Sequence, residues 1–243
     1  MKIRFSSTKL KGSVDAPPSK SMVHRAILCS AFCENPTTVF PVHLSKDCLA
    51  TIGAIKSLGA SVSVYADTIM ITPICTLPSS TIIDCNESGS TFRFLLPIAY
   101  ALGIQTKFLV MPSLAQRPIS HLTNLLISNG AIYEDFTIKG KLTSGCFSIT
   151  GDVSSQYITG LLFALSLLKQ PSTLIVTSPL QSQGYVDLTL WVLRQFGINI
   201  QVILPTPTDT FCVKYTVHAK ETLGYTSPLT LKIESDFSNL AFW

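Results

Sequence analysis

Charged side chains are scarce in this sequence. Asp, Glu, Lys and Arg make up 13% of its 243 residues, whereas hydrophobic residues make up 47%. A chain of this composition must bury much of its length, which excludes a disordered or low-complexity protein. The net charge of +4 is modest, and no run of Lys and Arg occurs. We expect no nucleic-acid partner, because nucleic-acid-binding domains cluster their basic residues. The small positive excess suits a small anion held in a cleft.

Long apolar runs and secretory signals are also missing. The longest apolar stretch, Tyr157 to Leu168, is too short to span a bilayer. The N-terminus, Met1 to Phe5, lacks the long apolar segment of a signal peptide. The seven cysteines form no Cys-x-x-Cys pair, and no His or carboxylate cluster completes a zinc site with Cys29 and Cys33. We expect a soluble, cytoplasmic protein with reduced, mostly buried thiols, no metal and no membrane contact.

Motifs for nucleotide cofactors and for acid–base pairs are absent as well. The sequence contains neither Gly-x-Gly-x-x-Gly nor Gly-Lys-Ser/Thr, so nothing supports a nucleotide cofactor. The four histidines show no partnered arrangement, and we expect a surface position for His24. Asp47 and Asp187 stand at expected helix openings and are interpreted as caps. No pair of carboxylates clearly forms an acid–base couple.

The sequence does contain a pattern that occurs three times. Each copy begins with a helix opening of small polar residues, and about 30 residues later a second helix ends in glycine. The openings are Pro17 to Arg25, Glu87 to Arg93 and Ser154 to Tyr157, and the terminal glycines are Gly59, Gly130 and Gly197. These glycines lie 71 and 67 residues apart. Glycine is expected after a helix because it adopts the left-handed conformation at little cost.

Strand candidates complete each copy. Alternating or β-branched stretches follow each glycine, and others lie between the helices: 61–65, 68–71, 107–110, 132–133, 146–149, 173–177, 198–203 and 211–214. The sequence therefore predicts an α/β (α+β) fold of three βαβαββ units of roughly 70 residues, with short sheets around packed helices. We assign these units to residues 20–231. Residues 1–19 are expected to form a strand and a Pro-Pro connection. Residues 232–243 leave the units, and 237–243 resemble either a helix trimmed short or the start of a second domain.

The three openings also suggest a binding function. The start of a helix presents unpaired N–H groups and a partial positive charge, which suit a phosphate or carboxylate. Lys20, Arg25, Arg93 and Arg117 stand near these starts. Together they favour a pocket for a multiply anionic small molecule. For any single motif, a capped surface helix with solvated charges explains the residues as well.

The first opening combines a cap with charged groups. Ser19 or Ser21 can cap the helix, and Ser21 and Arg25 share one helix face because they stand four residues apart. Lys20 stands between the two serines. A lysine, a hydroxyl and an arginine can hold a phosphate or carboxylate by charge-assisted hydrogen bonds.

The other two openings offer further donors. Gly89 would let a ligand approach the backbone, and Arg93 could either face that ligand or form an internal ion pair. Glu87 is interpreted as a cap. Arg117 precedes Pro118, a favoured first helical residue, and is placed for bidentate carboxylate binding. In the third unit the neutral donors Ser154, Ser155 and Gln156 fit either a polar substrate or simple capping.

These motifs, taken together, resemble the 5-enolpyruvylshikimate-3-phosphate (EPSP) synthase family. The resemblance rests on Ser19-Lys20-Ser21-x-x-x-Arg25, Glu87-Ser88-Gly89-Ser90-Thr91-x-Arg93, Gln116-Arg117-Pro118-Ile119, Ser154-Ser155-Gln156 and Tyr185-Val186-Asp187. It covers nearly the whole chain. UDP-N-acetylglucosamine enolpyruvyl transferase shares the architecture but opens with a Lys-Asn pair, and RNA 3′-terminal phosphate cyclase is more distant.

The resemblance implies transfer of enolpyruvyl from phosphoenolpyruvate to the 5-hydroxyl of shikimate 3-phosphate, with release of phosphate and with no metal or organic cofactor. It implies that Lys20 is catalytic and touches both substrates. Shikimate 3-phosphate would be bound by Ser21, Arg25, Ser154, Ser155 and Ser182, with Tyr185 beside them. The phosphoenolpyruvate site, where the inhibitor glyphosate competes, would be lined by Gly89, Arg117 and Gln156, and Gln156 would also reach the shikimate ring.

The chain departs from the family pattern in two ways. Glu87 stands where many relatives have Asn, and Gln183-Gly184 replaces a common Lys-Pro. Family members are also nearly twice as long, with two similar lobes that close over the substrates and further catalytic residues beyond the point reached here. We therefore expect one substrate-binding lobe of the two-domain enolpyruvyl transferase fold, with residues 1–19 and 232–243 belonging to the second lobe. The alternatives are a non-catalytic binding module and one half of a split enzyme, with a complementing lobe or self-association through the exposed face.

Overall fold

The computed structural model describes residues 12, 13, 15–218 and 224–236. Most of the strand expected within residues 1–19 and the helix expected at 237–243 lie outside these described residues. Among the described residues, no helix combines the length and apolar character needed to cross a bilayer. None of the seven cysteines, all of which are described, takes part in a disulfide. Four of them are buried, as the composition predicted: Cys29, Cys33, Cys48 and Cys85.

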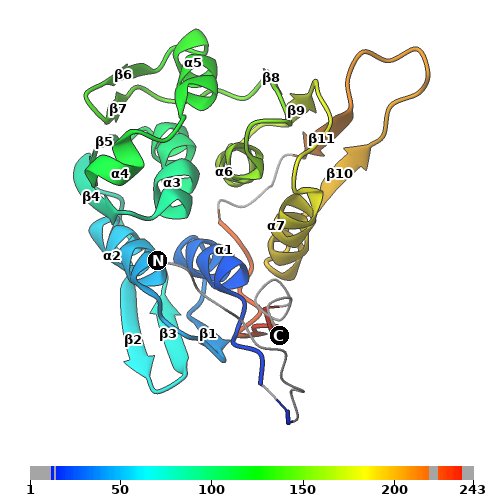
Figure 1. The fold of residues 1–243 in the computed structure, drawn as a ribbon. Coiled ribbons are helices and arrows are strands. Elements are labelled where there is room, and N and C mark those ends of the chain that lie inside the picture. Colours follow the sequence, from blue (N-terminus) through cyan, green and yellow to red (C-terminus); the bar gives the residue numbers. More distant parts are fainter. Residues whose placement is uncertain (1–11, 14, 219–223, 237–243) are drawn as a thin grey trace, which may run out of the picture.

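The described residues form three four-stranded sheets that surround the helices (Figure 1). The first has the order β12 (Thr230–Lys232), β1 (Thr37–Phe40), β3 (Thr68–Thr72) and β2 (Ser61–Tyr65). The second has the order β4 (Ser80–Asn86), β5 (Gln105–Val110), β7 (Thr137–Lys139) and β6 (Ile132–Glu134). The third has the order β8 (Cys146–Ile149), β9 (Ser172–Val176), β11 (Val213–Val217) and β10 (Ile200–Ile203). The predicted repeat of three βαβαββ units is confirmed.

Every sheet is built in the same way. Its first two strands run parallel and the remaining neighbours run antiparallel. The parallel pair needs a helical crossover, which α3 (Gly89–Leu102) supplies between β4 and β5, and α6 (Ser155–Ser166) between β8 and β9. In the first sheet, the strand parallel to β1 is β12, which comes from the far end of the chain. The first sheet therefore contains strands from both the N-terminal and the C-terminal part of the described chain.

The two chain segments that enter and leave this unit lie side by side. The backbone N–H of Ser19 donates to the carbonyl of Glu234 at 2.8 Å, and that of Asp236 donates to the carbonyl of Pro17 at 2.8 Å. The last described strand, β12, is short and ends at Lys232. The described chain thus enters and leaves the first unit at one point.

In the described part of the chain, six longer helices pack between the sheets, two in each unit. The first helix of each unit is almost entirely buried: α1 (Lys20–Ala31), α3 and α6. The second helices are α2 (Lys46–Ser57), α5 (Ser120–Ser128) and α7 (Gln183–Gln195). α3 and α6 lie next to each other in the middle of the molecule, and α1 lies between α2 and α7 (Figure 1). Apolar residues run almost continuously through α3 and α6 because these helices are covered on every side.

Serine caps and left-handed glycines set the ends of these helices. Ser19, Ser88 and Ser154 each stand before the first residue of their helix and accept a hydrogen bond from a backbone N–H in its first turn. The terminal glycines of the second helices have φ values of 108°, 92° and 74° and lie just beyond the last helical turn: Gly59, Gly130 and Gly197. The predicted role of these glycines is confirmed.

The second helix of the middle unit begins later than predicted. The sequence predicted that this helix begins near Arg117 and Pro118. In the structure, α5 begins at Ser120. A separate short helix, α4 (Pro112–Ala115), precedes it. The backbone between them is held by other parts of the fold, because the carbonyl of Pro118 accepts hydrogen bonds from the Tyr157 hydroxyl and the Arg93 guanidinium. Contacts with other parts of the fold therefore hold this backbone outside the helix, and α5 begins later than the local sequence pattern predicted.

Candidate functional site

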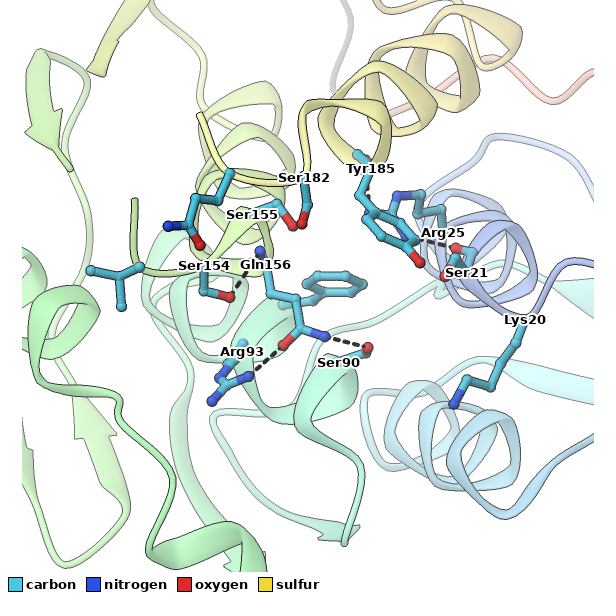
Figure 2. A pocket seen from close by; sticks show the side chains of 13 residues that line it. Lys20, Ser21, Arg25, Ser90, Arg93, Ser154, Ser155, Gln156, Ser182 and Tyr185 are labelled. Carbon is cyan, nitrogen blue, oxygen red and sulfur yellow. Dashed lines mark hydrogen bonds between the residues drawn. The ribbon is translucent and has the colours of Figure 1, made fainter. Parts of the chain in front are cut away.

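A cavity of about 420 Å³ opens where several helices begin (Figure 2). Its lining comes from the starts of α1, α3, α6 and α7 and the segments before α6 and α7: Lys20, Ser21, Arg25, Ser90, Arg93, Phe94, Val153, Ser154, Ser155, Gln156, Gln181, Ser182 and Tyr185. Eight of these residues belong to the site predicted from the sequence: Lys20, Ser21, Arg25, Ser154, Ser155, Gln156, Ser182 and Tyr185. The fold thus gathers residues that are up to 165 positions apart in the chain.

The helix starts give this cavity a positive character. Unpaired N–H groups at a helix start carry a partial positive charge. At α7 the preceding residue, Ser182, has φ 58° and its side chain caps no backbone N–H. Its hydroxyl is therefore not used by the helix and lies in the cavity wall (Figure 2).

Lys20 is held by a carboxylate from the neighbouring helix. Its Nζ lies 2.9 Å from Oδ2 of Asp47, and the two side chains are 49% and 34% exposed. An ion pair this exposed contributes little to stability, but it restricts where the ammonium can go. The interpretation of Asp47 as a cap is wrong, because Ser45 caps α2 and Asp47 lies in the first helical turn. Asp187 is likewise no cap, since it lies inside α7.

Arg25 is buried and fastens three helices together. Its Nε donates to Thr189 at 2.8 Å, its Nη1 to the carbonyl of Ser21 at 2.7 Å, and its Nη2 to Thr159 and to the carbonyl of Tyr185. Burial lowers the pKa of this guanidinium to about 10. Four of its N–H donors are thus engaged within the protein, so its contribution at the cavity is largely a fixed positive charge.

Gln156 lies across the cavity from Lys20 with its carboxamide held at both ends (Figure 2). Its Oε1 accepts from Nη1 of Arg93 at 2.6 Å, and its Nε2 donates to the hydroxyl of Ser90 at 3.0 Å. Arg93 also donates to the carbonyl of Pro118. The sequence left open whether Arg93 faces a ligand or forms an internal ion pair. In the structure Arg93 lines the cavity, and the partners described here are neutral oxygens.

Gly89 and Arg117 stand beside the cavity. A Cβ placed on Gly89 would lie 3.5 Å from Nη1 of Arg117, 3.5 Å from Nη1 of Arg93 and 3.7 Å from Oε1 of Gln156. The open side of Gly89 therefore faces two guanidinium groups and an amide. All ten residues predicted for the site are thus brought together, although neither Gly89 nor Arg117 is part of the lining itself.

Some site features differ from the sequence-based interpretation. Glu87 is not the cap of α3, because Ser88 has that role and Glu87 accepts from the Ser113 hydroxyl at 2.8 Å. Five lining residues were not among the ten predicted site residues. For Arg93 the sequence left a ligand-facing and an internally paired position open, and the other four were not predicted at the site: Ser90, Phe94, Val153 and Gln181. Ser90 stood inside a quoted motif and could have been found there. No local sequence signal marks the other three.

His24 is buried, so the expectation of a surface position is wrong. Its side chain is 1% exposed, and Nδ1 lies 2.7 Å from the hydroxyl of Thr51. Hydroxyl contacts of 2.7 Å continue from Thr51 to Thr91 and from Thr91 to Ser88. Burial lowers the pKa of His24 to about 3, which keeps the ring neutral. The reason is the position of α1, which is packed on both sides and leaves little of its surface to solvent.

A second cavity of about 350 Å³ adjoins the first at the crossing of the two chain segments. It is lined by Ser19, Ser21, Ser182, Gly184, Tyr185, Leu188, Glu234, Ser235 and Asp236. Ser21, Ser182 and Tyr185 line both cavities. The candidate site therefore extends to the point where the described chain enters and leaves the three units.

Comparison with known proteins agrees with this architecture. The 3-phosphoshikimate 1-carboxyvinyltransferase of Clostridium perfringens is 38% identical over 250 residues, covering 100% of this chain and 57% of that protein. The protein of the same description from Clostridium beijerinckii is 35% identical, covering 97% and 55%. This chain thus spans little more than half the length of these curated relatives.

Solved structures show the same fold. An EPSP synthase from Acinetobacter baumannii superposes with a TM-score of 0.74 at 23% identity, covering 95% of this chain and 51% of that one. The enolpyruvyl transferase NikO from Streptomyces tendae gives a TM-score of 0.65 at 16% identity, covering 96% and 54%. The family model described as EPSP synthase (3-phosphoshikimate 1-carboxyvinyltransferase) matches residues 6–243. The chain belongs to the EPSP synthase family.

Proposed function

We propose that this chain binds shikimate 3-phosphate and phosphoenolpyruvate in the 420 Å³ cavity. It would do so as the substrate-binding lobe of an enzyme that transfers enolpyruvyl to the 5-hydroxyl of shikimate 3-phosphate and releases phosphate. The observation that carries the proposal is the convergence of helix starts and cationic side chains on one concave surface. Both substrates bear phosphate and carboxylate groups, which such a surface favours.

The geometry supports a division of the cavity between the substrates. We assign shikimate 3-phosphate to Arg25, Tyr185 and four serines, all of which line the cavity: Ser21, Ser154, Ser155 and Ser182. Gly89, Arg117 and Gln156 lie together, and they would receive phosphoenolpyruvate. Lys20 starts α1 at the cavity rim, where its ammonium would reach both substrates. It is the residue of this chain that we propose as catalytic.

We further propose that the 243-residue chain by itself binds substrate weakly and has negligible turnover. When these 243 residues are tested alone, the groups of the cavity face solvent, and the solvent dielectric weakens each charge interaction. Closure of an active site excludes water and completes its charged groups. Without closure we expect a dissociation constant for shikimate 3-phosphate of about 1 mM, or about −4 kcal/mol.

Calorimetry with shikimate 3-phosphate tests this function, with and without glyphosate. Lys20→Ala should weaken binding by about 10- to 150-fold, because one charge-assisted hydrogen bond contributes about 1.5–3 kcal/mol. Lys56→Ala is the matched control, since Lys56 lies in the last turn of α2 away from the cavity. Equal affinity of the wild type and Lys20→Ala would refute the placement of the site. Near-normal phosphate release by the wild type would refute the proposed lack of turnover.

The chain covers little more than half of the length of its relatives, so a complementation experiment is a further test. Mixing the chain with the separately produced remaining lobe of a relative should restore phosphate release if the chain is one half of a split enzyme. Binding of shikimate 3-phosphate without any restored release would favour a non-catalytic binding module. Sedimentation at several concentrations would show whether the chain associates with itself instead.

A further inference from the structure

Arg93 joins two parts of the candidate site. Its Nη1 donates to Oε1 of Gln156 at 2.6 Å, and its Nη2 donates to the carbonyl oxygen of Pro118 at 3.2 Å. Its guanidinium carbon lies 5.5 Å from the centre of the Tyr157 ring, and Tyr157 follows Gln156 on α6. One side chain from α3 therefore contacts both the start of α6 and the loop that carries Arg117.

The first contact determines how the Gln156 carboxamide is turned. Arginine has five N–H donors and no acceptor. The atom of Gln156 that faces Arg93 must therefore be the oxygen, and the nitrogen must point the other way. There Nε2 donates one hydrogen to the Ser90 hydroxyl at 3.0 Å. The second hydrogen of Nε2 remains for a ligand in the cavity that Gln156 lines. Arg93 thus makes Gln156 present a donor, which suits an anion.

The second contact holds the loop before α5. The carbonyl of Pro118 accepts from Arg93 and, at 2.5 Å, from the hydroxyl of Tyr157. Arg117 is the next residue toward the N-terminus, and its Nη1 and that of Arg93 both lie 3.5 Å from the place of a Cβ on Gly89. Two guanidinium groups are therefore held near each other beside the cavity. Like charges at such a distance repel, and an anion between them relieves the repulsion.

We propose that Arg93 is a positioning residue for the ligand site: it turns the amide N–H groups of Gln156 toward the cavity and anchors the loop that carries Arg117. The proposal rests on the proposed function and concerns its phosphoenolpyruvate part. Arg93 acts through Gln156 and Arg117, so its effect should depend on their presence.

Two substitutions separate charge from geometry. Arg93→Met removes the charge and all donors while keeping an unbranched chain. Arg93→Lys keeps the charge and a donor, but its single ammonium cannot bridge Gln156 and Pro118 as the guanidinium does. We expect phosphoenolpyruvate binding to the chain saturated with shikimate 3-phosphate to weaken roughly 10- to 100-fold in Arg93→Met and by an intermediate factor in Arg93→Lys. Arg194→Met, on the exposed face of α7, is the matched control and should bind as the wild type does.

A double-mutant cycle tests whether Arg93 acts through Gln156. In a Gln156→Ala background, Arg93→Met should have a much smaller effect on phosphoenolpyruvate affinity than in the wild type. Purely additive effects would overturn the proposal, because a merely structural or long-range electrostatic role does not require Gln156. Unchanged phosphoenolpyruvate affinity in Arg93→Met would overturn it as well.

The orientation of the Gln156 amide can also be tested by NMR without any ligand. In protein with ¹⁵N-labelled glutamine side chains, one of the two Gln156 Nε2 proton signals of the wild type should be slow to exchange with solvent. Arg93→Met should shift these signals and speed their exchange, and Arg93→Lys should largely keep them. Signals that are identical in the wild type and Arg93→Met would overturn the proposal. If the wild type binds neither substrate but its amide signals depend on Arg93, the proposed function fails and the positioning role stands.

Discussion

Neighbouring residues of α1 connect different parts of the molecule. His24 contacts Thr51 of α2 and, through its hydroxyl, Thr91 of α3. Arg25 contacts Thr159 of α6 and Thr189 of α7. Consecutive helical residues point about 100° apart, so two adjacent side chains can contact different neighbouring helices. One turn of α1 thus ties the first unit to the second and the third.

The buried His24 predicts a loss of stability in acid. Its pKa is lowered to about 3 by burial, from 6.5 in an exposed histidine. The unfolded chain binds the proton more readily, so the free energy of unfolding should fall as the pH drops below 6.5 toward about 3. The slope from this one group is up to about 1.4 kcal/mol per pH unit. Urea titrations at a series of pH values measure it.

His24→Asn is the matched variant for this test, because its amide nitrogen can replace Nδ1 toward Thr51 but does not titrate. Below pH 6.5, the free energy of unfolding of this variant should fall less steeply with decreasing pH than that of the wild type. The difference in slope is the part that comes from protonation of His24. Parallel pH profiles for the two proteins would contradict the assignment of the slope to His24.

Replacement of Arg25 by lysine should destabilise the fold strongly although it is a conservative substitution. Arg25→Lys keeps the charge but cannot replace four hydrogen bonds, so buried hydroxyl and carbonyl groups lose their donor. The free energy of unfolding should fall by about 2–4 kcal/mol. Arg194→Lys, which is exposed, should change it by less than about 0.5 kcal/mol. Chemical denaturation gives both values, and similar values for the two variants would refute the fastening role.

At the scale of the elements, α3 and α6 approach each other closely at Gly160. A Cβ on Gly160 would lie 2.4 Å from the backbone oxygen of Arg93 and 3.0 Å from Cγ of Pro97. Such a contact with backbone cannot be relieved by rotating a side chain. Glycine at this position therefore sets the spacing of the two central helices.

Gly160→Ala should consequently destabilise the fold by about 1–3 kcal/mol or more, as overpacking of an interior does. Gly53→Ala is the matched control in α2, where an added Cβ meets no atom of the described residues within 4 Å. Because alanine is the better helix former, it should stabilise by about 0.5–1 kcal/mol. Thermal unfolding of the two variants should shift in opposite directions, and a stable Gly160→Ala would contradict the close packing.

At the scale of the whole molecule, the first unit depends on both ends of the described chain. β12 pairs with β1, and Leu231 in β12 is 4% exposed. Leu231→Ala should lower the free energy of unfolding by about 2–4 kcal/mol. Leu229→Ala, at a side chain that is 64% exposed, should have little effect.

The shape of the unfolding curve tests cooperativity in the same experiment. If β12 is an integral part of one cooperative lobe, Leu231→Ala should lower the midpoint of a single transition without changing its slope. A separate early transition would show that the first unit opens independently of the other two.

Much of the architecture could be read from local patterns. The glycines at 59, 130 and 197, the small polar openings of the first helices and most strands are visible because capping and side-chain alternation repeat at short range. The cap of α3 was assigned to the wrong neighbour, since it is Ser88 and not Glu87. Three copies of one pattern predicted three similar units, and the helix starts predicted an anion site. The ten site residues that the family resemblance implied also lie together.

Other features were decided by tertiary structure. The burial of His24, the late start of α5, the role of β12 in the first sheet and the partners of Arg93 all depend on residues far apart in the chain. The sequence by itself determined the elements and their order, because propensity and capping act within a few residues. Only the tertiary structure decided which polar side chains meet, because burial and hydrogen-bond partners are set by packing between units.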